Sequence, residues 1–295
     1  MRTSSVLLYT LRGIATEIAK NIVLAGIGNI TLVDEQDVTE EDLGANFFLR
    51  EEDLGKKRVE AAAPRIQALN PRVNVKTETD AGKMEDEAFV AGFDLVVVTD
   101  VDAPTLLKVN ALTRKLGKKL FAASSIGMDG WIFADLLEHD YMINKSKTAA
   151  GGGDPVITPT RQQKSYVPFS VALENTWEKS TKRAVGKVGE GLWGVLATFK
   201  TQIGFPGQPL TVENLTSTAS THLPSLGVDP SLLSSASIAR IVATAPYEFP
   251  PSTAILGGIC GQDVLNALGG KEEPVRNLLV FVGETGAGNV YALGC

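Results

Sequence analysis

The stretch VLLYTLRGIATEIAKNIVLAGIGNITLVD, residues 6–34, contains the pattern that decides the fold. A short apolar run at 6–10 is followed by 13–25, in which isoleucine recurs at every fourth position. A second apolar run at 29–34 ends on Asp34. Apolar residues at this spacing indicate an amphipathic helix, whereas short apolar runs between turns indicate buried strands. The stretch therefore predicts a strand, a helix and a second, parallel strand joined by a right-handed crossover.

The same alternation of strand and helix continues through the first half of the chain. Helices are expected at 55–69 and 103–116, and apolar runs at 72–77, 94–99 and 118–123 predict strands. Continuous apolar runs of this kind suit strands that are covered on both faces. We therefore expect an α/β fold with a doubly wound, mostly parallel sheet of the Rossmann-like type.

The chain is then expected to leave the sheet, make a helical excursion and return. Residues 145–165 are largely small and polar and include the Gly-rich stretch 151–153, which predicts a flexible surface loop. A helix expected at 252–268 and strands expected at 277–282 and 289–293 resume the alternation of helix and strand seen in the first half. The expected division is a sheet domain at 1–144 and 246–295, a loop at 145–165, and a small helical insertion, or half-domain, at 166–245.

The composition argues against several classes of function. The net charge is −6, so the chain lacks the excess of Lys and Arg with which proteins bind nucleic-acid phosphates. No stretch of about 18 apolar residues occurs, so a membrane span is not expected. Two cysteines, Cys260 and Cys295, and two histidines are too few for a disulfide framework or an ordinary four-ligand zinc site. We therefore expect no metal, nucleic acid or membrane among the partners.

Residues 6–34 also have the outline of a nucleotide-binding unit. In such units glycines let the backbone approach phosphates, the helix N-terminus favours anions, and an acid after the second strand binds ribose hydroxyls. Asp34 lies at the position of that acid, but Gly13 is the only glycine of the turn. Leu11 and Arg12 place side chains where phosphate oxygens would approach the backbone. The pattern therefore fits a purely structural turn better than a working nucleotide site.

Motifs along nearly the whole chain resemble the adenylation-domain family that includes bacterial ThiF and MoeB and both halves of the enzymes that activate ubiquitin-like proteins. They are EIAKNIVLAG at 17–26, ITLVD at 30–34, ALNP at 68–71, LGGI at 256–259 and the helix at 262–268. The order of elements and the chain length most resemble the small, non-catalytic subunit of the SUMO-activating heterodimer. The resemblance implies the Rossmann-like adenylation fold.

The resemblance also implies that the working residues of the family are absent. Catalytic members carry an arginine after the ribose acid, a lysine downstream and a metal-binding aspartate after a later strand. The corresponding positions are Ala45, Arg58 and Thr99, with Asp100 offset by one residue. A neutral methyl group cannot stabilise charge that develops at the α-phosphate. We therefore expect no catalytic residue and no working cofactor or metal site in this chain. The vestigial candidates for a cofactor site are Gly13, Asp34, Arg58 and Asp100.

The implied function is that of a regulatory subunit, a pseudoenzyme in protein sumoylation. A larger catalytic subunit would form a heterodimer with it, bind ATP and Mg²⁺, adenylate the SUMO-like modifier and take it as a thioester. This chain would meet the modifier only indirectly. The expected compartment is the nucleus, with the cytoplasm as the second. Partner contacts are expected at Asn46, Phe47, Phe48 and Arg50.

Three alternatives stay open. The first is the regulatory subunit of the NEDD8-activating enzyme, whose insertion is generally larger. The second is a self-sufficient ThiF-like adenylyltransferase, which would need the missing arginine and glycines. The third is a nicotinamide-dependent oxidoreductase, which would need an intact glycine turn.

Several remaining side chains are interpreted as structural. Trp193 and Phe199, together with Trp177, are expected to form a small core of the helical insertion itself. Cys260 is interpreted as a packed apolar residue, because its neighbours are small and apolar. His139 and His222 are expected at the surface or in loops.

Overall fold

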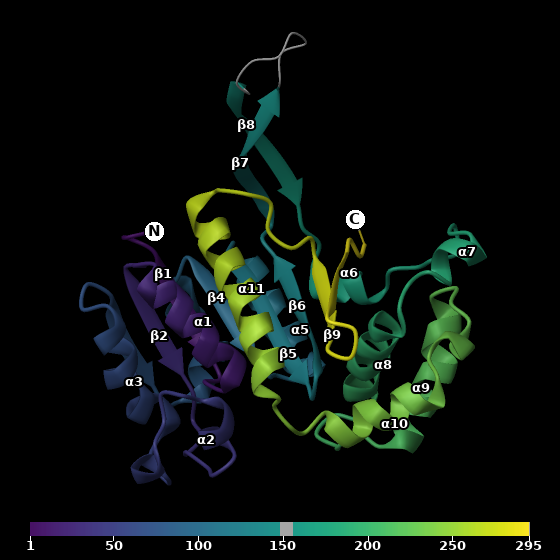
Figure 1. Cartoon of the computed structure of the whole chain (residues 1–295), viewed down its shortest axis with the longest axis horizontal. Helices are drawn as coiled ribbons and strands as arrows, with labels where there is room; N and C mark the ends of the chain where they lie inside the picture. The colour runs from purple at the N-terminus through teal and green to yellow at the C-terminus, as the bar shows by residue number, and fades with distance from the viewer. Residues whose placement is uncertain (148–155, 295) are drawn as a thin grey trace.

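The computed structural model describes residues 1–147 and 156–294. Its centre is an eight-stranded sheet in the order β10-β9-β6-β5-β4-β1-β2-β3, in which β1 to β5 run parallel (Figure 1). The predicted doubly wound, mostly parallel α/β fold is confirmed. The parallel strands are Ser5–Tyr9 (β1), Asn29–Val33 (β2), Asn74–Glu78 (β3), Leu95–Thr99 (β4) and Lys119–Ile126 (β5).

Three antiparallel strands extend the sheet beyond β5. The chain turns back at Gly127, whose φ is +60°, and Ile126 then pairs with Asp129. A Cβ at Gly127 would also lie 2.4 Å from the Cβ of Thr244, so both the backbone and the available space require glycine. The antiparallel strands are Asp129–Asp135 (β6), Leu278–Val282 (β9) and Ala287–Tyr291 (β10).

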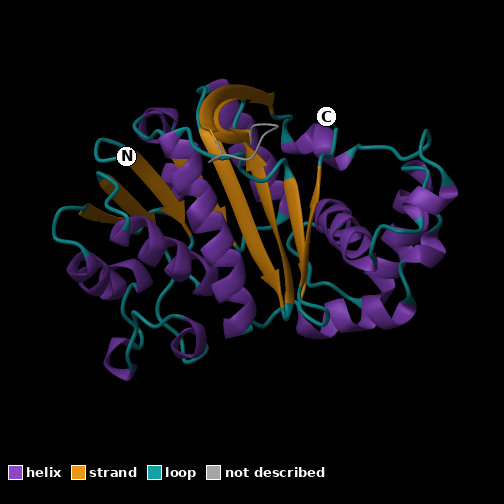
Figure 2. Cartoon of the chain, turned by 45° about the horizontal axis from the view of Figure 1, so that its top comes forward, coloured by secondary structure: helices purple, strands orange, loops and turns teal. Residues whose placement is uncertain are grey.

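Helices cover both faces of this sheet (Figure 2). One face packs against α1, α3 and α11, and the other against α5, α6 and α8, so that each face has its own buried core. The isoleucines of α1 are fully buried, as their spacing predicts. The helices of the sheet domain are Gly13–Leu24 (α1), Asp42–Ala45 (α2), Arg58–Leu69 (α3), Glu87–Ala91 (α4), Ala103–Lys115 (α5) and Pro250–Gly269 (α11), with short 3₁₀ turns at Glu51–Asp53 and Ala81–Glu85.

A helical segment lies between the last hairpin strand and α11, beside the antiparallel end of the sheet. Trp193 and Phe199 of its central helix are buried, which confirms their interpretation as core. The core is not separate, however, because the ring of Phe199 packs edge-on against Trp131 of β6 with centroids 4.8 Å apart. The helices are Phe169–Leu173 (α6), Lys182–Val185 (α7), Glu190–Gly204 (α8), Val212–Ser225 (α9) and Ser235–Thr244 (α10), with a 3₁₀ turn at Pro230–Leu232.

A two-stranded hairpin stands where a loop is predicted at 145–165. Strands Glu138–Lys147 (β7) and Val156–Ser165 (β8) pair antiparallel and leave the main body at the top of Figure 1. The prediction is wrong for the paired part, because these strands bond to each other and so need no continuous apolar run. The Gly-rich stretch 151–153 lies outside the described residues. Across the described part of the chain, no helix has the length and apolar character that a membrane crossing requires.

Candidate nucleotide site

The turn at 10–13 lies at the carboxyl end of β1, where a nucleotide phosphate would meet the N-terminus of α1. Thr10 has a φ of +68°, a left-handed conformation that residues other than glycine rarely adopt. Leu11 is buried, and its N–H donates to Oδ2 of Asp34 at 2.8 Å. The side-chain amide of Asn46 donates to the Leu11 carbonyl at 3.0 Å. Side chains of the protein itself therefore hold this turn.

Asp34 lies at the end of β2, where the sequence predicts the ribose-binding acid. Its Oδ2 accepts bonds from the Leu11 N–H and from Nη1 of Arg58, the latter at 2.6 Å. Its Oδ1 accepts from the N–H of Gln36 at 2.9 Å, and the residue is only 2% exposed. The Asp34 carboxylate, which the sequence predicts would bind a ribose, is therefore already hydrogen-bonded to groups of the protein itself.

Arg58 begins α3 and is buried between two carboxylates. It donates to Asp34 through Nη1 and to Oδ2 of Asp42 through Nη2 at 3.2 Å. Burial by itself would lower the pKa of Arg58, but the charges of the two acids outweigh it and raise that pKa above its ordinary value. Asp42, which sequence reasoning did not identify, also accepts bonds from the N–H and hydroxyl of Thr39. Arg58 is thus engaged and does not extend freely toward a phosphate.

Glu248 supplies an anion at the N-terminus of α1. Its Oε1 accepts a bond from the N–H of Gly13 at 2.9 Å, and its Oε2 forms an ion pair with Nε of Arg12 at 3.5 Å. A phosphate in a working site would bind the same backbone N–H groups. The methyl group of Ala45 is also close to Gly13, 3.1 Å from where a Cβ on that glycine would stand. Nothing in the sequence identifies Glu248, because it is far from Gly13 along the chain.

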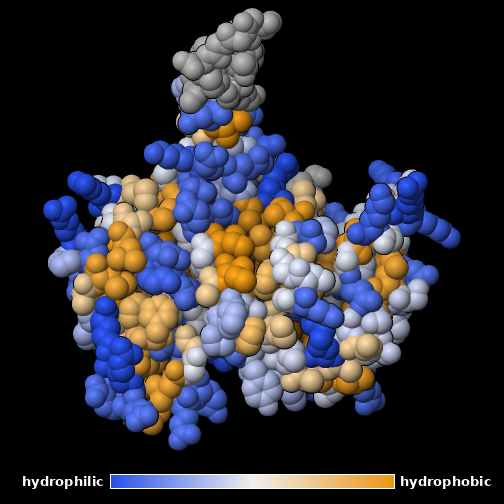
Figure 3. Space-filling view, viewed as in Figure 1, coloured by the Kyte–Doolittle hydropathy of each residue, from blue (hydrophilic) through white to orange (hydrophobic). Residues whose placement is uncertain are grey.

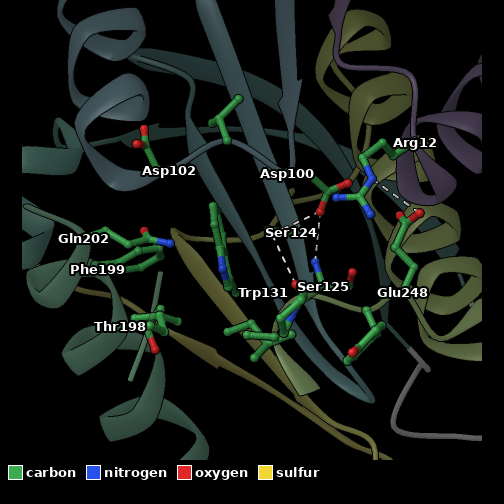
Figure 4. Close-up of a pocket in the computed structure, with 16 residues that line it drawn as sticks. Arg12, Asp100, Asp102, Ser124, Ser125, Trp131, Thr198, Phe199, Gln202 and Glu248 are labelled. Carbon is green, nitrogen blue, oxygen red and sulfur yellow. Dashed lines mark hydrogen bonds and ion pairs between the residues drawn. The ribbon is translucent and has the colours of Figure 1, made fainter. Parts of the chain in front are cut away.

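Asp100 follows β4 and points toward the same region (Figure 4). Its Oδ1 accepts from the hydroxyl of Ser124 at 3.0 Å and from the N–H of Ser125 at 3.3 Å. Burial raises the pKa of both Asp100 and Glu248, and the charge of Asp100 adds to the rise at Glu248. The hydroxyl of Thr99 donates to the Thr10 carbonyl at 2.7 Å, so this position links two strand ends.

Two cavities adjoin these residues. The smaller, about 230 Å³, contains Arg12, Asp100 and Glu248 in its wall. The larger, about 680 Å³, lies over the turn and is lined by the same arginine, by Arg58, and by the acids Glu41, Asp42 and Glu248. The three acids of this lining outnumber its two arginines, so the lining has no excess of positive charge. The lining therefore disfavours a polyphosphate.

The four residues predicted to contact a partner divide into two pairs. Asn46 and Phe48 are 1% and 4% exposed, so neither side chain reaches the surface of this chain. Asn46 instead joins the turn after β1 to the loop after α2 and accepts from the Phe48 N–H at 3.1 Å. Phe47 is 42% exposed, and Arg50 is an exposed residue whose Nη1 donates to the Phe47 and Leu49 carbonyls. Only these last two are placed where a partner has access.

The remaining candidate side chains are structural. Cys260 is fully buried in the middle of α11, and burial raises the pKa of its thiol, which confirms the interpretation as a packed residue. The histidine prediction is wrong, because His139 and His222 are both buried, and burial lowers the pKa of each to about 4. In residues 1–147 and 156–294, no three His, Cys, Asp or Glu side chains are grouped as a metal site.

Comparisons with known proteins identify the family to which this fold belongs. The ThiF family model matches residues 1–289. The chain is 33% identical to SUMO-activating enzyme subunit 1 of Homo sapiens over 100% of its own length and 90% of that protein. It is 32% identical to the DNA damage tolerance protein RHC31 of Saccharomyces cerevisiae over 97% of this chain and 89% of that protein.

A solved structure shows the same fold at lower similarity. A crystal structure of E. coli MccB with succinimide superposes with a TM-score of 0.58 at 14% identity. The superposition covers 99% of this chain and 64% of that one, and it supports the fold alone. The family match and the full-length relatives show that this chain belongs to the ThiF family.

Proposed function

We propose that this chain is the regulatory, non-catalytic subunit of a SUMO-activating enzyme. The observation that carries the proposal is that the predicted nucleotide-binding groups are bonded within the protein: the Gly13 N–H donates to Glu248, and Arg58 donates to Asp34. The full-length similarity to SUMO-activating enzyme subunit 1 points to the class of enzyme.

The chemistry of adenylation supports a catalytic role for another chain. The reaction needs donors that stabilise charge at the α-phosphate, and here the clamp position is Ala45, a residue without a polar side-chain atom. Thioester formation also needs an accessible thiolate, and the one cysteine within residues 1–147 and 156–294, Cys260, is fully buried in α11. A larger partner would therefore supply ATP, Mg²⁺ and the reactive cysteine, and this chain would meet the SUMO-like modifier through it.

The surface supports a protein partner. Apolar side chains gather near the middle of the face drawn in Figure 3, around the place of α11. Exposed apolar residues on the α1 and α11 side include Leu24, Phe47 and Ile255, each more than 40% exposed. Exposed apolar side chains gathered on one face are typical of protein-binding surfaces. A heterodimer that resides in the nucleus, and secondarily in the cytoplasm, is the assembly we propose.

ATP–pyrophosphate exchange tests the proposal. The isolated chain is expected to give no exchange with SUMO, NEDD8 or ubiquitin. Co-expression with a larger, cysteine-bearing adenylation subunit should give a stable complex that exchanges with SUMO in preference to the other two. In that complex 8-azido-ATP should label the larger subunit.

Three results would contradict the proposal. Exchange by the isolated chain would favour a self-sufficient adenylyltransferase. Preference of the complex for NEDD8 would favour the other activating enzyme. Tight binding of NADH by the isolated chain would favour an oxidoreductase.

A further inference from the structure

Glu248 lies in the connector between α10 and α11, at a point where the chain has little freedom. Its backbone forms a parallel bridge with Gly127 after β5, and α11 begins two residues later at Pro250. The side chain is only 8% exposed and projects back to the start of α1. The sheet and α11 therefore hold Glu248 from both sides.

The first turn of α1 contains no acidic residue of its own. The N-cap residue of this helix, Arg12, makes no side-chain cap. The unpaired N–H groups and the helix dipole favour an anion at such an end. The Glu248 carboxylate provides this anion: it accepts a hydrogen bond from the Gly13 N–H and forms an ion pair with the Arg12 guanidinium.

A phosphate and this carboxylate cannot occupy the position together. A single Cβ built on Gly13 would already lie 3.0 Å from the Glu248 oxygen, so the space next to this N–H is filled. The two anions would also repel each other at short distance. Asp100 adds to the repulsion whenever it is charged, and in the described residues its Oδ2 has no hydrogen-bond partner.

We propose that Glu248 is an intramolecular substitute for a phosphate group, which closes the anion position at the N-terminus of α1 and keeps this chain free of nucleotide. The inference deepens the proposed non-catalytic role and rests on it. The ligand class that the closed position would otherwise take is a phosphate or pyrophosphate anion, bound by the Gly13 N–H and Arg12.

The test is a titration of the isolated full chain with inorganic pyrophosphate, followed at the Gly13 amide by NMR. The wild-type amide is expected not to shift. Glu248→Ala should give a saturable shift with binding roughly tenfold or more tighter, because a charge-assisted hydrogen bond to the backbone becomes available. Adding Arg12→Ala to Glu248→Ala should reverse most of that gain.

Glu41→Ala is the matched control. Glu41 is an exposed acid in the lining of the same larger cavity, and it does not touch Gly13. Its removal changes the net charge by the same amount and should leave the Gly13 amide unresponsive. If Glu248→Ala does not fold, the nearly isosteric Glu248→Gln replaces it in the titration. It should also bind pyrophosphate more tightly than wild type does, by a smaller factor than expected for Glu248→Ala.

Two results would overturn the inference. One is a Gly13 shift in the wild-type chain at the same pyrophosphate concentration. The other is the absence of a shift in a folded Glu248 variant. Neither result bears on the exchange assay, so a failure of the closed site is distinguishable from a failure of the proposed function.

Discussion

Arg58 bonds two buried carboxylates at once, and this arrangement ties the end of β2 to the starts of α2 and α3. Asp34 and Asp42 are 2% and 4% exposed, so each needs a charged partner inside the protein. The same guanidinium provides both, at the position where catalytic relatives are expected to carry a lysine. Asp34, which the sequence predicts as a ribose-binding acid, is thus part of a buried ion-pair network.

Removing this guanidinium should destabilise the fold strongly. Arg58→Ala leaves two carboxylates buried without their partner, and we expect the free energy of unfolding to fall by about 3–5 kcal/mol. Urea unfolding followed by circular dichroism measures the change. The neighbouring Lys57→Ala removes an exposed pair with Asp37 and should cost about 1 kcal/mol or less. Equal losses in the two variants would contradict the assignment.

Asp263 gives the chain a specific pH dependence. It is 8% exposed in α11, and burial raises its pKa from 3.8 to about 6, although the Val275 N–H donates to it at 2.7 Å. The folded chain therefore holds this proton more tightly than the unfolded chain does. The stabilisation that comes from the protonated Asp263 side chain is therefore fully present below about pH 4. It is lost as the pH rises from about 4 to about 6 and above.

Asp263→Asn should remove that dependence, because the amide keeps an acceptor for Val275 and carries no charge. Relative to wild type, the variant should gain up to about 3 kcal/mol of stability between about pH 4 and about pH 7. Thermal or urea unfolding at both pH values measures the gain. A constant difference between the two proteins at both pH values would show that Asp263 is not the titrating group.

At the scale of elements, the contact between α1 and α11 is set by glycine. A Cβ at Gly257 would lie 2.4 Å from the Cβ of Glu17 and 2.8 Å from the carbonyl oxygen of Ile14, which is backbone and cannot move aside. The next residue of the same helix, Gly258, has no atom within 4 Å of a Cβ. The glycine pair therefore combines one close helix contact with one open position.

The two glycines should respond to alanine in opposite directions. Gly257→Ala forces the helices apart and should lower the free energy of unfolding by about 1–3 kcal/mol. Gly258→Ala adds helix propensity at an open site and should raise it by up to about 1 kcal/mol. Denaturant midpoints at constant slope measure both changes. Two changes of the same sign would contradict the packing described for α1 and α11.

At the scale of the whole molecule, the helical segment and the sheet share one core. Trp131 of β6 contacts Phe199 of α8, which in turn packs on Phe169 with ring centroids 5.0 Å apart. Phe169 then contacts Phe133 of β6 at 5.1 Å. The four rings form a continuous chain of contacts that crosses the boundary between the two regions twice, so the helical segment is not an independent domain.

This shared core predicts a single unfolding transition. Tryptophan fluorescence reports both regions, because Trp131 lies in the sheet and Trp193 in α8. Its transition should coincide with that of far-UV circular dichroism. A variant with both Trp177→Phe and Trp193→Phe, which leaves Trp131 of the sheet as the remaining tryptophan, should give the same midpoint by both methods. Two separate transitions would show that the helical segment unfolds independently.

The amino-acid sequence by itself determined the strands and helices of the sheet and the family. These properties are local, since apolar periodicity reports burial and a motif reports its own residues. Only the tertiary structure decided that Glu248 bonds the Gly13 N–H, that Asp42 shares Arg58, that Asn46 and Phe48 face inward, and that the helical segment shares the core of the sheet. Each of these depends on which distant residue the chain path brings within a few ångströms, and no local pattern contains that information.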